Sequence, residues 1–324
     1  MIRNALNLLR LTLTAMVALI MVSAAAQGFP ERPIKILVPY SAGSTTDIIA
    51  RLIATALAER TKQTVVVENR IGAGGIVGLK ALQASPADGY TIGLVVSGNA
   101  VQPWLMKDMP FDVRKDFTPL SLMYVGQYLL MVPPELPPQN LAEFLAYLKS
   151  NPKKVFFGSS GAGTTTHLAG ELLKQMGGVE MTHVPFKGSP EVFNAMFSGS
   201  VQAYFDLYGT AKPLIDAGKV RPLATSGKTR MASLPNLPAL AEALPGFEVL
   251  VWTGFAVPNG TPPNVVAKLT TELRAVMQAP ELRKRLADMG VEPGGGTSAA
   301  MAIFVAAEYE KWGKTIQAAG IKPE

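Results

Sequence analysis

Two patterns of hydrophobic and polar positions alternate along most of the chain. Short apolar runs are followed by small and polar residues, and then by segments with apolar positions at helical spacing, as in residues 48–60. Strands that alternate with helices predict an α/β fold with mixed, mainly parallel sheets flanked by helices. We expect strands at 34–39, 64–68, 91–96, 155–157, 181–184, 202–206, 220–225 and 248–257, and helices at 48–60, 168–176, 265–277, 282–289 and 301–316.

Two places interrupt this repeat. The apolar runs 120–125 and 128–132 follow each other with no space for a helix, and the run 248–257 ends at Pro258-Asn259-Gly260. Each place predicts that the chain leaves one sheet and enters another. We therefore expect two lobes, with residues 27–127 and 251–324 in lobe 1 and residues 128–250 in the inserted lobe 2. A cleft between two such lobes is a common ligand site. After the second crossing the pattern shows three helices and no clear strand.

Residues 1–26 have the pattern of a secretory signal peptide. Arg3 and Arg10 supply the positive charge before an apolar run at 11–22, and Ala24-Ala25-Ala26 is a typical small-residue cleavage site. A membrane anchor is the alternative, but a span needs about 20 apolar residues and this run is shorter. We expect an exported protein, which in a bacterium means the periplasm, with cleavage near Ala26.

Composition excludes several kinds of chemistry. The 324 residues are 48% hydrophobic and 17% charged, as in globular proteins. They include no Cys, which removes thiol nucleophiles, disulfides and cysteine-bound metals, and two His, which argues against a histidine metal site. The net charge of +6 is scattered along the chain, so it supports an anionic ligand weakly and a nucleic acid poorly. We expect no metal and no cofactor.

Two loops share one unusual composition. Residues 40–47 (YSAGSTTD) follow the first strand, and residues 158–166 (GSSGAGTTT) follow the strand 155–157, each just before a helix. Backbone N–H groups and the helix dipole make such a position favourable for an anion, and Ser and Thr hydroxyls can add hydrogen bonds. The alternative is that both loops only cap their helices, since Ser44-Thr45-Thr46-Asp47 fits a capping box. The sequence leaves both interpretations open.

Nucleotide and catalytic motifs match poorly. Residues 163–165 lack the lysine of a P-loop, residues 72–77 (GAGGIV) lack the last glycine of G-x-G-x-x-G, and residues 158–162 depart from G-x-S-x-G at the fifth position. A serine hydrolase would need Ser159 or Ser160, a histidine (167 or 183) and a carboxylate such as Asp206. Both histidines fit structural roles better. Asp206 ends a strand, where it either caps a turn or receives an ammonium or hydroxyl group of a ligand.

The chain resembles, from end to end, the Bug-type solute receptors of tripartite tricarboxylate transporters. The matching segments are PIKILVPY (33–40), VVVENRIGAGG (65–75), ADGYT (87–91), GSSGAGTTTHL (158–168), HVPFKG (183–188), DAGKVR (216–221), LATS (223–226) and VPNGTPP (257–263). The resemblance implies a two-lobed periplasmic binding protein of the type II Venus-flytrap class. It also implies a non-catalytic monomer that captures a small carboxylate for a membrane permease. A sensor that presents the carboxylate to a histidine kinase is the alternative.

The resemblance also implies which residues bind the ligand, with one departure from the family pattern. Ser44 stands where the family's first loop usually has a second glycine, which narrows the pocket and adds a donor, with backbone strain if φ is positive there. Ser97 and Asn99, which follow the strand 91–96, are included. The expected ligand-binding residues are Tyr40, Ser41, Ala42, Gly43, Ser44, Thr45, Asp47, Ser97, Asn99, Ser159, Ser160, Gly163, Thr164, Thr165, Thr166 and Asp206.

Overall fold

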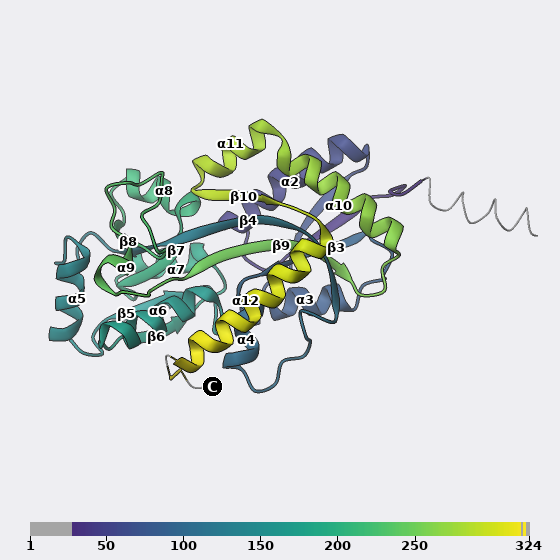
Figure 1. The fold of residues 1–324 in the computed structure, drawn as a ribbon. Helices are drawn as coiled ribbons and strands as arrows, with labels where there is room; N and C mark the ends of the chain where they lie inside the picture. Colours follow the sequence, from purple (N-terminus) through teal and green to yellow (C-terminus); the bar gives the residue numbers. More distant parts are fainter. Residues whose placement is uncertain (1–27, 319, 322–324) are drawn as a thin grey trace, which may run out of the picture.

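The computed structural model describes residues 28–318, 320 and 321, so the expected signal peptide lies outside the described residues. The described chain forms two α/β lobes that share one long strand, β4 (Phe117–Val132), which crosses the middle of Figure 1. Within the described residues, no helix is both long and apolar enough to cross a membrane.

The first sheet holds the strands nearest to the N-terminus. Its order is β2-β1-β3-β9-β4, and β10 also pairs with β4. β1 pairs in parallel with β2 and β3, whereas β9 pairs antiparallel with β3 and β4. Ile34, Ile36 and Val38 of β1 are fully buried and Leu37 is almost so, as expected for a strand covered on both faces. The bounds are β1 (Ile34–Val38), β2 (Val65–Asn69), β3 (Thr91–Val96), β9 (Leu250–Pro258) and β10 (Val291–Gly295).

The second sheet continues from the last five residues of β4. Residues 128–132 of β4 pair antiparallel with β7 and with β8, and β5 lies in parallel between β7 and β6. β4 therefore changes its neighbours between Gln127, which pairs with Leu250, and Tyr128, which pairs with Leu207. The bounds are β5 (Phe156–Ser159), β6 (Thr182–Pro185), β7 (Ala203–Leu207) and β8 (Arg221–Thr225).

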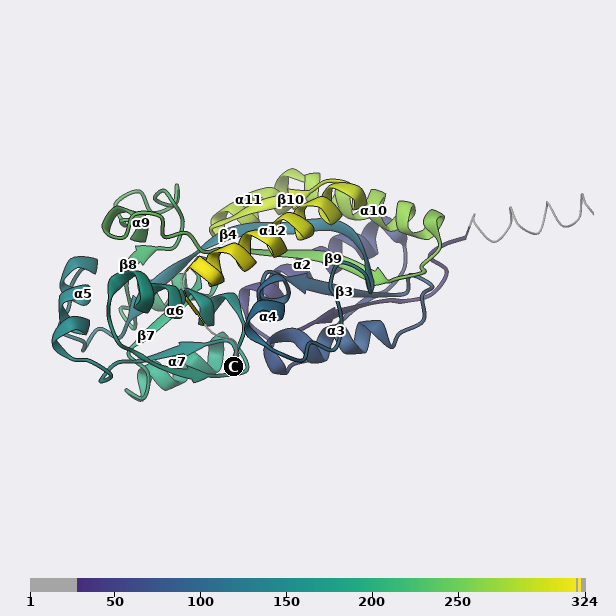
Figure 2. The same ribbon diagram turned by 60° about the horizontal axis from the view of Figure 1, so that its bottom comes forward.

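Helices cover both sheets. α2 packs on α10, and the long C-terminal helix α12 packs along β4 and against α4, as Figure 2 shows from below. α6 and α7 pack on strands of the second sheet. The bounds are α2 (Thr45–Thr61), η1 (Ala73–Gly75), α3 (Ile76–Gln83), α4 (Gly98–Leu105), α5 (Leu141–Ser150), α6 (Thr165–Gly177), α7 (Ser189–Phe197), α8 (Tyr208–Asp216), α9 (Leu240–Ala243), α10 (Pro263–Gln278), α11 (Pro280–Asp288) and α12 (Ser298–Ala318).

The structure confirms the two-lobed α/β fold and differs from the expected elements in four ways. The expected helices did not include α3, α4, α5, α7, α8 and α9. The apolar runs 120–125 and 128–132 are parts of the single strand β4. The C-terminal region contains a strand, β10, which the sequence analysis missed because Pro293 and two glycines hide the apolar alternation. The sheets carry more antiparallel pairing than the repeated strand–helix pattern suggested, because β4 and β9 run against their neighbours. The limits of the lobes stay a prediction.

Candidate functional site

A narrow polar cavity lies where the β1–α2 loop meets the β5–α6 loop. Its volume is about 30 Å³, space for one or two water molecules. We call it the interlobe cavity, because Ser44 lines it from the first lobe and Ser160 from the second. Its lining residues are Tyr40, Ser44, Thr45, Thr46, Val96, Tyr128, Ser160, Thr164, Thr166, Gly188, Ser189, Asp206, Leu207, Val251 and Thr253.

The first loop is held rigidly at the start of α2. Ser44 is the N-cap, and its Oγ accepts a hydrogen bond from the Asp47 N–H at 3.3 Å. Its φ of −68° shows that serine is unstrained there, so the expected cost of replacing the family glycine does not arise. The positive φ of 81° falls on Gly43 instead, whose N–H donates to Asp47 Oδ2.

Asp47 organises this loop rather than facing the cavity. Its carboxylate accepts hydrogen bonds from Arg51, from the Asn69 amide and from the Gly43 N–H. Burial by itself would raise the pKa of Asp47, but these hydrogen bonds outweigh burial and hold the pKa below its ordinary value. Asp47 is therefore ionised and fixes the backbone that precedes α2.

The second loop repeats the arrangement at the start of α6. Thr164 is the N-cap, and its Oγ1 accepts from the His167 N–H while donating to the Gly161 carbonyl. Thr166 Oγ1 accepts from the Ser160 N–H at 3.0 Å, which folds the loop back over the helix terminus. The N-termini of two helices thus point at one cavity, where both helix dipoles favour negative charge.

Hydroxyl groups join the two lobes around the cavity. Ser97 Oγ lies 3.0 Å from Thr165 Oγ1, and the Thr45 N–H donates to Thr210 Oγ1 at 3.1 Å. Ser41 Oγ reaches the Glu191 carboxylate and the carbonyl of Lys187. These bonds connect segments more than sixty residues apart and hold the lobes in a closed arrangement.

Backbones also approach each other closely across the cleft. A Cβ atom built on Gly74 would lie 2.7 Å from the Ala162 carbonyl oxygen, and one built on Gly161 would lie 3.2 Å from the Gly74 Cα atom. The glycine-rich segment 72–75, which fails as a nucleotide motif, is therefore a contact surface between the lobes. Only glycine allows this contact, because any side chain would push the second loop away.

Asp206 carries the negative charge nearest to the cavity. It is the last but one residue of β7 and is only 5% exposed, and its Oδ2 atom is buried without a hydrogen-bond partner among the described residues. Burial raises the pKa of Asp206 to about 7, although the Leu207 N–H and the Ser189 hydroxyl favour the ionised form. A buried acceptor with no donor is costly, so a donor group that entered the cavity would stabilise this oxygen.

Four tyrosine hydroxyls surround the same region. Burial raises the pKa of each of them, so all four stay neutral and can donate a hydrogen bond. Tyr128 bonds to Thr165 at 2.7 Å, and Tyr204 bonds to Ser160 and donates to Ser189. The other two are Tyr40, which lines the cavity, and Tyr124, which bonds to Thr46 at 2.8 Å.

The structure brings together about half of the expected ligand-binding residues. Those that line the interlobe cavity are Tyr40, Ser44, Thr45, Ser160, Thr164, Thr166 and Asp206. The others support the loops or join the lobes, and the cavity lining does not include them: Ser41, Ala42, Gly43, Asp47, Ser97, Asn99, Ser159, Gly163 and Thr165. Asn99, for example, accepts from the Val96 N–H, and Ala42 and Gly43 are exposed.

Some lining residues were not found from the sequence. Gly188 and Ser189 form a third loop between a strand and a helix, β6 to α7, and their small size was the available signal. Tyr128, Val251 and Thr253 lie in β4 and β9, where only the register of the strands decides which side chains face the cavity.

The histidines lie behind the second loop. The rings of His167 and His183 stack with centroids 3.9 Å apart, and burial lowers the pKa of His183 to about 3. Ser159 Oγ contacts His183 Nε2 at 2.6 Å, but Ser159 is fully buried and also bonds to Gly161. Asp206 lines the interlobe cavity with Ser160, whereas Ser159 and the two histidines are not part of that lining.

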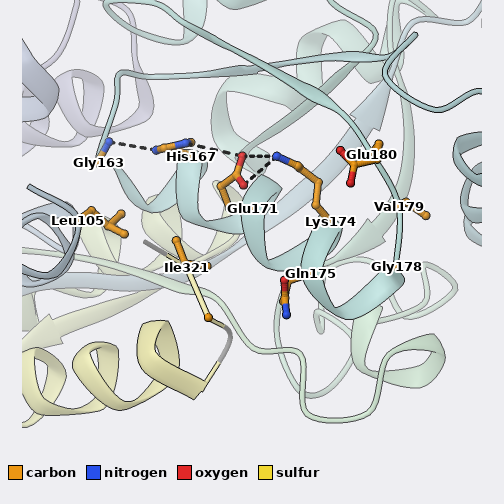
Figure 3. Close-up of a pocket in the computed structure, with 11 residues that line it drawn as sticks. Leu105, Gly163, His167, Glu171, Lys174, Gln175, Gly178, Val179, Glu180 and Ile321 are labelled. Carbon is orange, nitrogen blue, oxygen red and sulfur yellow. Dashed lines mark hydrogen bonds and ion pairs between the residues drawn. The ribbon is translucent and has the colours of Figure 1, made fainter. Parts of the chain in front are cut away.

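A second pocket lies between α6 and the residues Leu105 and Ile321 (Figure 3). Its volume is about 450 Å³, and a chain of polar contacts runs along it from the Gly163 N–H through His167 and Glu171 to Lys174. His167 Nδ1 accepts from Gly163 and so ties the second loop to the helix. We assign this row of contacts to the support of the loop. Within the described residues, no group of three or more His, Asp or Glu side chains is placed to hold a metal ion.

The fold and the paired loops define a class: a two-lobed α/β solute-binding protein. The model of the family "Tripartite tricarboxylate transporter family receptor" matches residues 49–321, and the chain belongs to this family. It is 31% identical to the protein BugT of Bordetella pertussis over 300 residues, 92% of each chain.

Two solved structures are similar over almost the whole chain. A protein of R. palustris solved with adipate is 37% identical, with a TM-score of 0.88 over 91% of this chain and 100% of that one. MatC from Rhodopseudomonas palustris, solved with bound malate, is 30% identical, with a TM-score of 0.84 over 89% of this chain and 100% of that one. The expected resemblance is thus confirmed.

Proposed function

We propose that the protein captures a small carboxylate in the interlobe cleft and delivers it to a membrane permease of the tripartite tricarboxylate type. The observation that carries the proposal is the convergence of the N-termini of α2 and α6, with their hydroxyl groups, on one cavity. Two aligned helix dipoles and several O–H and N–H donors stabilise a carboxylate without a basic side chain. The adipate and malate of the similar structures support this ligand class.

Ligand capture requires that the lobes separate. The cavity of about 30 Å³ is smaller than a dicarboxylate, and Thr45, Thr210, Ser97 and Thr165 bond across the cleft around it. Opening at β4 and β9 would expose the loop hydroxyls to a ligand. Closure around the ligand would then be favoured by contacts that exist only in the closed form.

The rest of the proposal concerns the setting of this activity. Residues 1–26 would direct export to the periplasm and be removed near Ala26. The mature monomer would bind its ligand there and dock transiently on the permease, and the family's description as a transporter receptor supports this. Binding, and no chemical conversion of the ligand, is the expected activity.

Calorimetry with a panel of mono-, di- and tricarboxylates tests the proposal. Thr166→Val should weaken the binding of the preferred carboxylate about tenfold, because the hydroxyl that orders the second loop is lost. Thr271→Val is the matched control, since Thr271 is an exposed residue of α10 whose hydroxyl bonds only to its own helix. Heat from amines or neutral sugars, with none from any carboxylate, would refute the proposed function.

A further inference from the structure

The inference begins with an imbalance of charge in the interlobe cavity. Asp206 is the one acidic side chain among the described residues that line it, and these residues include no Lys, Arg or His. A ligand carboxylate held by the two helix N-termini would therefore share a small, closed space with a second carboxyl group. Like charges at such a distance repel strongly where water is excluded.

The hydrogen bonds of Asp206 are also incomplete. The Ser189 hydroxyl and the Leu207 N–H act on the carboxyl group, but Oδ2 is buried and has no partner among the described residues. Among the nearby hydroxyls, Tyr204 donates to Ser189 and Tyr124 is bonded to Thr46. Thr253 Oγ1, which belongs to a cavity-lining residue, is also buried without a partner among the described residues, so it makes no hydrogen bond to Oδ2. The chain itself thus leaves one acceptor open on the cavity side.

We propose that Asp206 is a specificity-determining residue: it selects a carboxylate ligand that also carries a hydrogen-bond donor, an ammonium or a hydroxyl group, close to the carboxylate. This inference rests on the proposed function. The donor would satisfy Oδ2, and an ammonium group would in addition cancel the negative charge of Asp206. An unsubstituted acid supplies neither, and could enter only beside a protonated Asp206.

The protonation of Asp206 gives a signature of this role. The titratable groups that face it are Tyr40, Tyr124, Tyr128 and Tyr204, and burial raises the pKa of each, so they stay neutral when Asp206 titrates. An ammonium ligand requires the ionised carboxylate, so its affinity should rise from about pH 6 to about pH 8. The affinity of an unsubstituted acid should fall over the same range.

The experiment is calorimetry with matched ligand sets. Each set holds an unsubstituted acid, its 2-hydroxy form and its 2-amino form: propionate, lactate and alanine; succinate, malate and aspartate; glutarate, 2-hydroxyglutarate and glutamate. Within the set that binds, the wild type should prefer a substituted ligand by at least about tenfold, the value of a hydrogen bond to a charged group. The preferred substituent identifies the donor as ammonium or hydroxyl.

Three variants separate selectivity from folding. Asp206→Asn should remove a preference for ammonium and the dependence on pH, because the amide carries no charge, and Asp206→Leu should also remove a preference for hydroxyl, because leucine has no acceptor. The melting temperature of each variant shows that it is folded. Asp216→Asn should keep the preference and the dependence on pH, because Asp216 is exposed at the end of α8 and paired with Lys212.

Equal or tighter binding of the unsubstituted acid by the wild type, an unchanged preference for ammonium in Asp206→Asn, or an unchanged preference for hydroxyl in Asp206→Leu, would overturn the inference. No heat from any ligand in any set would overturn the inference, whereas the proposed function fails only if the wider panel of mono-, di- and tricarboxylates also gives no heat.

Discussion

The buried carboxyl group of Asp206, whose Oδ2 has no partner among the described residues, predicts a measurable effect on stability in the ligand-free protein. The change to test is Asp206→Asn, which keeps the size of the side chain and removes its titration. In the folded protein, burial raises the pKa of Asp206 from 3.8 to about 7. The unfolded chain has the ordinary value. The folded state therefore keeps a proton, between these two pH values, that the unfolded state has already released.

The sign and size follow from this difference. The wild type loses stability as the pH rises from about 4 to about 7, because ionisation is harder in the folded state. A difference of about three pH units corresponds to about 4 kcal/mol in the free energy of unfolding. Asp206→Asn escapes this loss. It should match the wild type near pH 4 and exceed it by about 4 kcal/mol near pH 8.

Urea unfolding of both proteins at a series of pH values measures the effect. The other titrating groups are the same in both proteins, so they cancel in the difference between the two unfolding free energies. A difference that stays constant within about 1 kcal/mol from pH 4 to pH 8 would show that Asp206 titrates as an exposed aspartate. The charge argument for ligand selection would then lose its basis.

Three further predictions concern the loops and their supports. Gly74→Ala should weaken ligand binding at least about tenfold, because the new Cβ would collide with the Ala162 carbonyl across the cleft. Gly218→Ala is the control, since Gly218 has a similar positive φ but lies in open space, and it should keep the affinity. Equal losses of affinity in the two variants, measured by calorimetry, would contradict this. His183→Gln should reduce the loss of stability as the pH falls from about 6.5 toward 3. Burial holds the pKa of His183 near 3 in the folded protein, so the unfolded chain takes up this proton first and is favoured in acid. Unfolding curves of the variant that are as acid-sensitive as those of the wild type would speak against this. Asp47→Ala should lower the free energy of unfolding by about 2 to 4 kcal/mol, because the donors that it binds are left without an acceptor, and a loss below about 1 kcal/mol in urea would be inconsistent with that role.

Local pattern was sufficient to predict most of the elements. The strands β1 and β3 and the helix α6, which ends at Gly177 with Gly178 as its C-cap, were visible from apolar spacing and from glycine at the helix end. The two loops were recognised because serine, threonine and glycine are concentrated between the end of a predicted strand and the start of a predicted helix. The strand β10 and the helices α3, α4, α5, α7, α8 and α9 were missed. Proline or glycine occurs inside β10, α3, α4, α7 and α8 and weakens their local pattern.

Contacts between distant segments were beyond this reasoning. The sequence shows that residues 72–75 are rich in glycine, but not that Gly74 meets Ala162 across the cleft. It shows Asp206 at the end of a strand, but not that Oδ2 lacks a donor, because the donors come from other elements. Thr253 faces the cavity through the register of β9 on β4, which depends on the whole first sheet.

The long strand β4 has a mechanical consequence. With sixteen residues it spans about 50 Å, and each lobe uses part of it as a central strand of its own sheet. Removing one lobe, or exchanging it with the same lobe of a relative, would therefore remove part of a central strand from the sheet of the other lobe. We expect the two lobes to move by bending and twisting of β4 near Gly126. We also expect both lobes to unfold together in one cooperative transition.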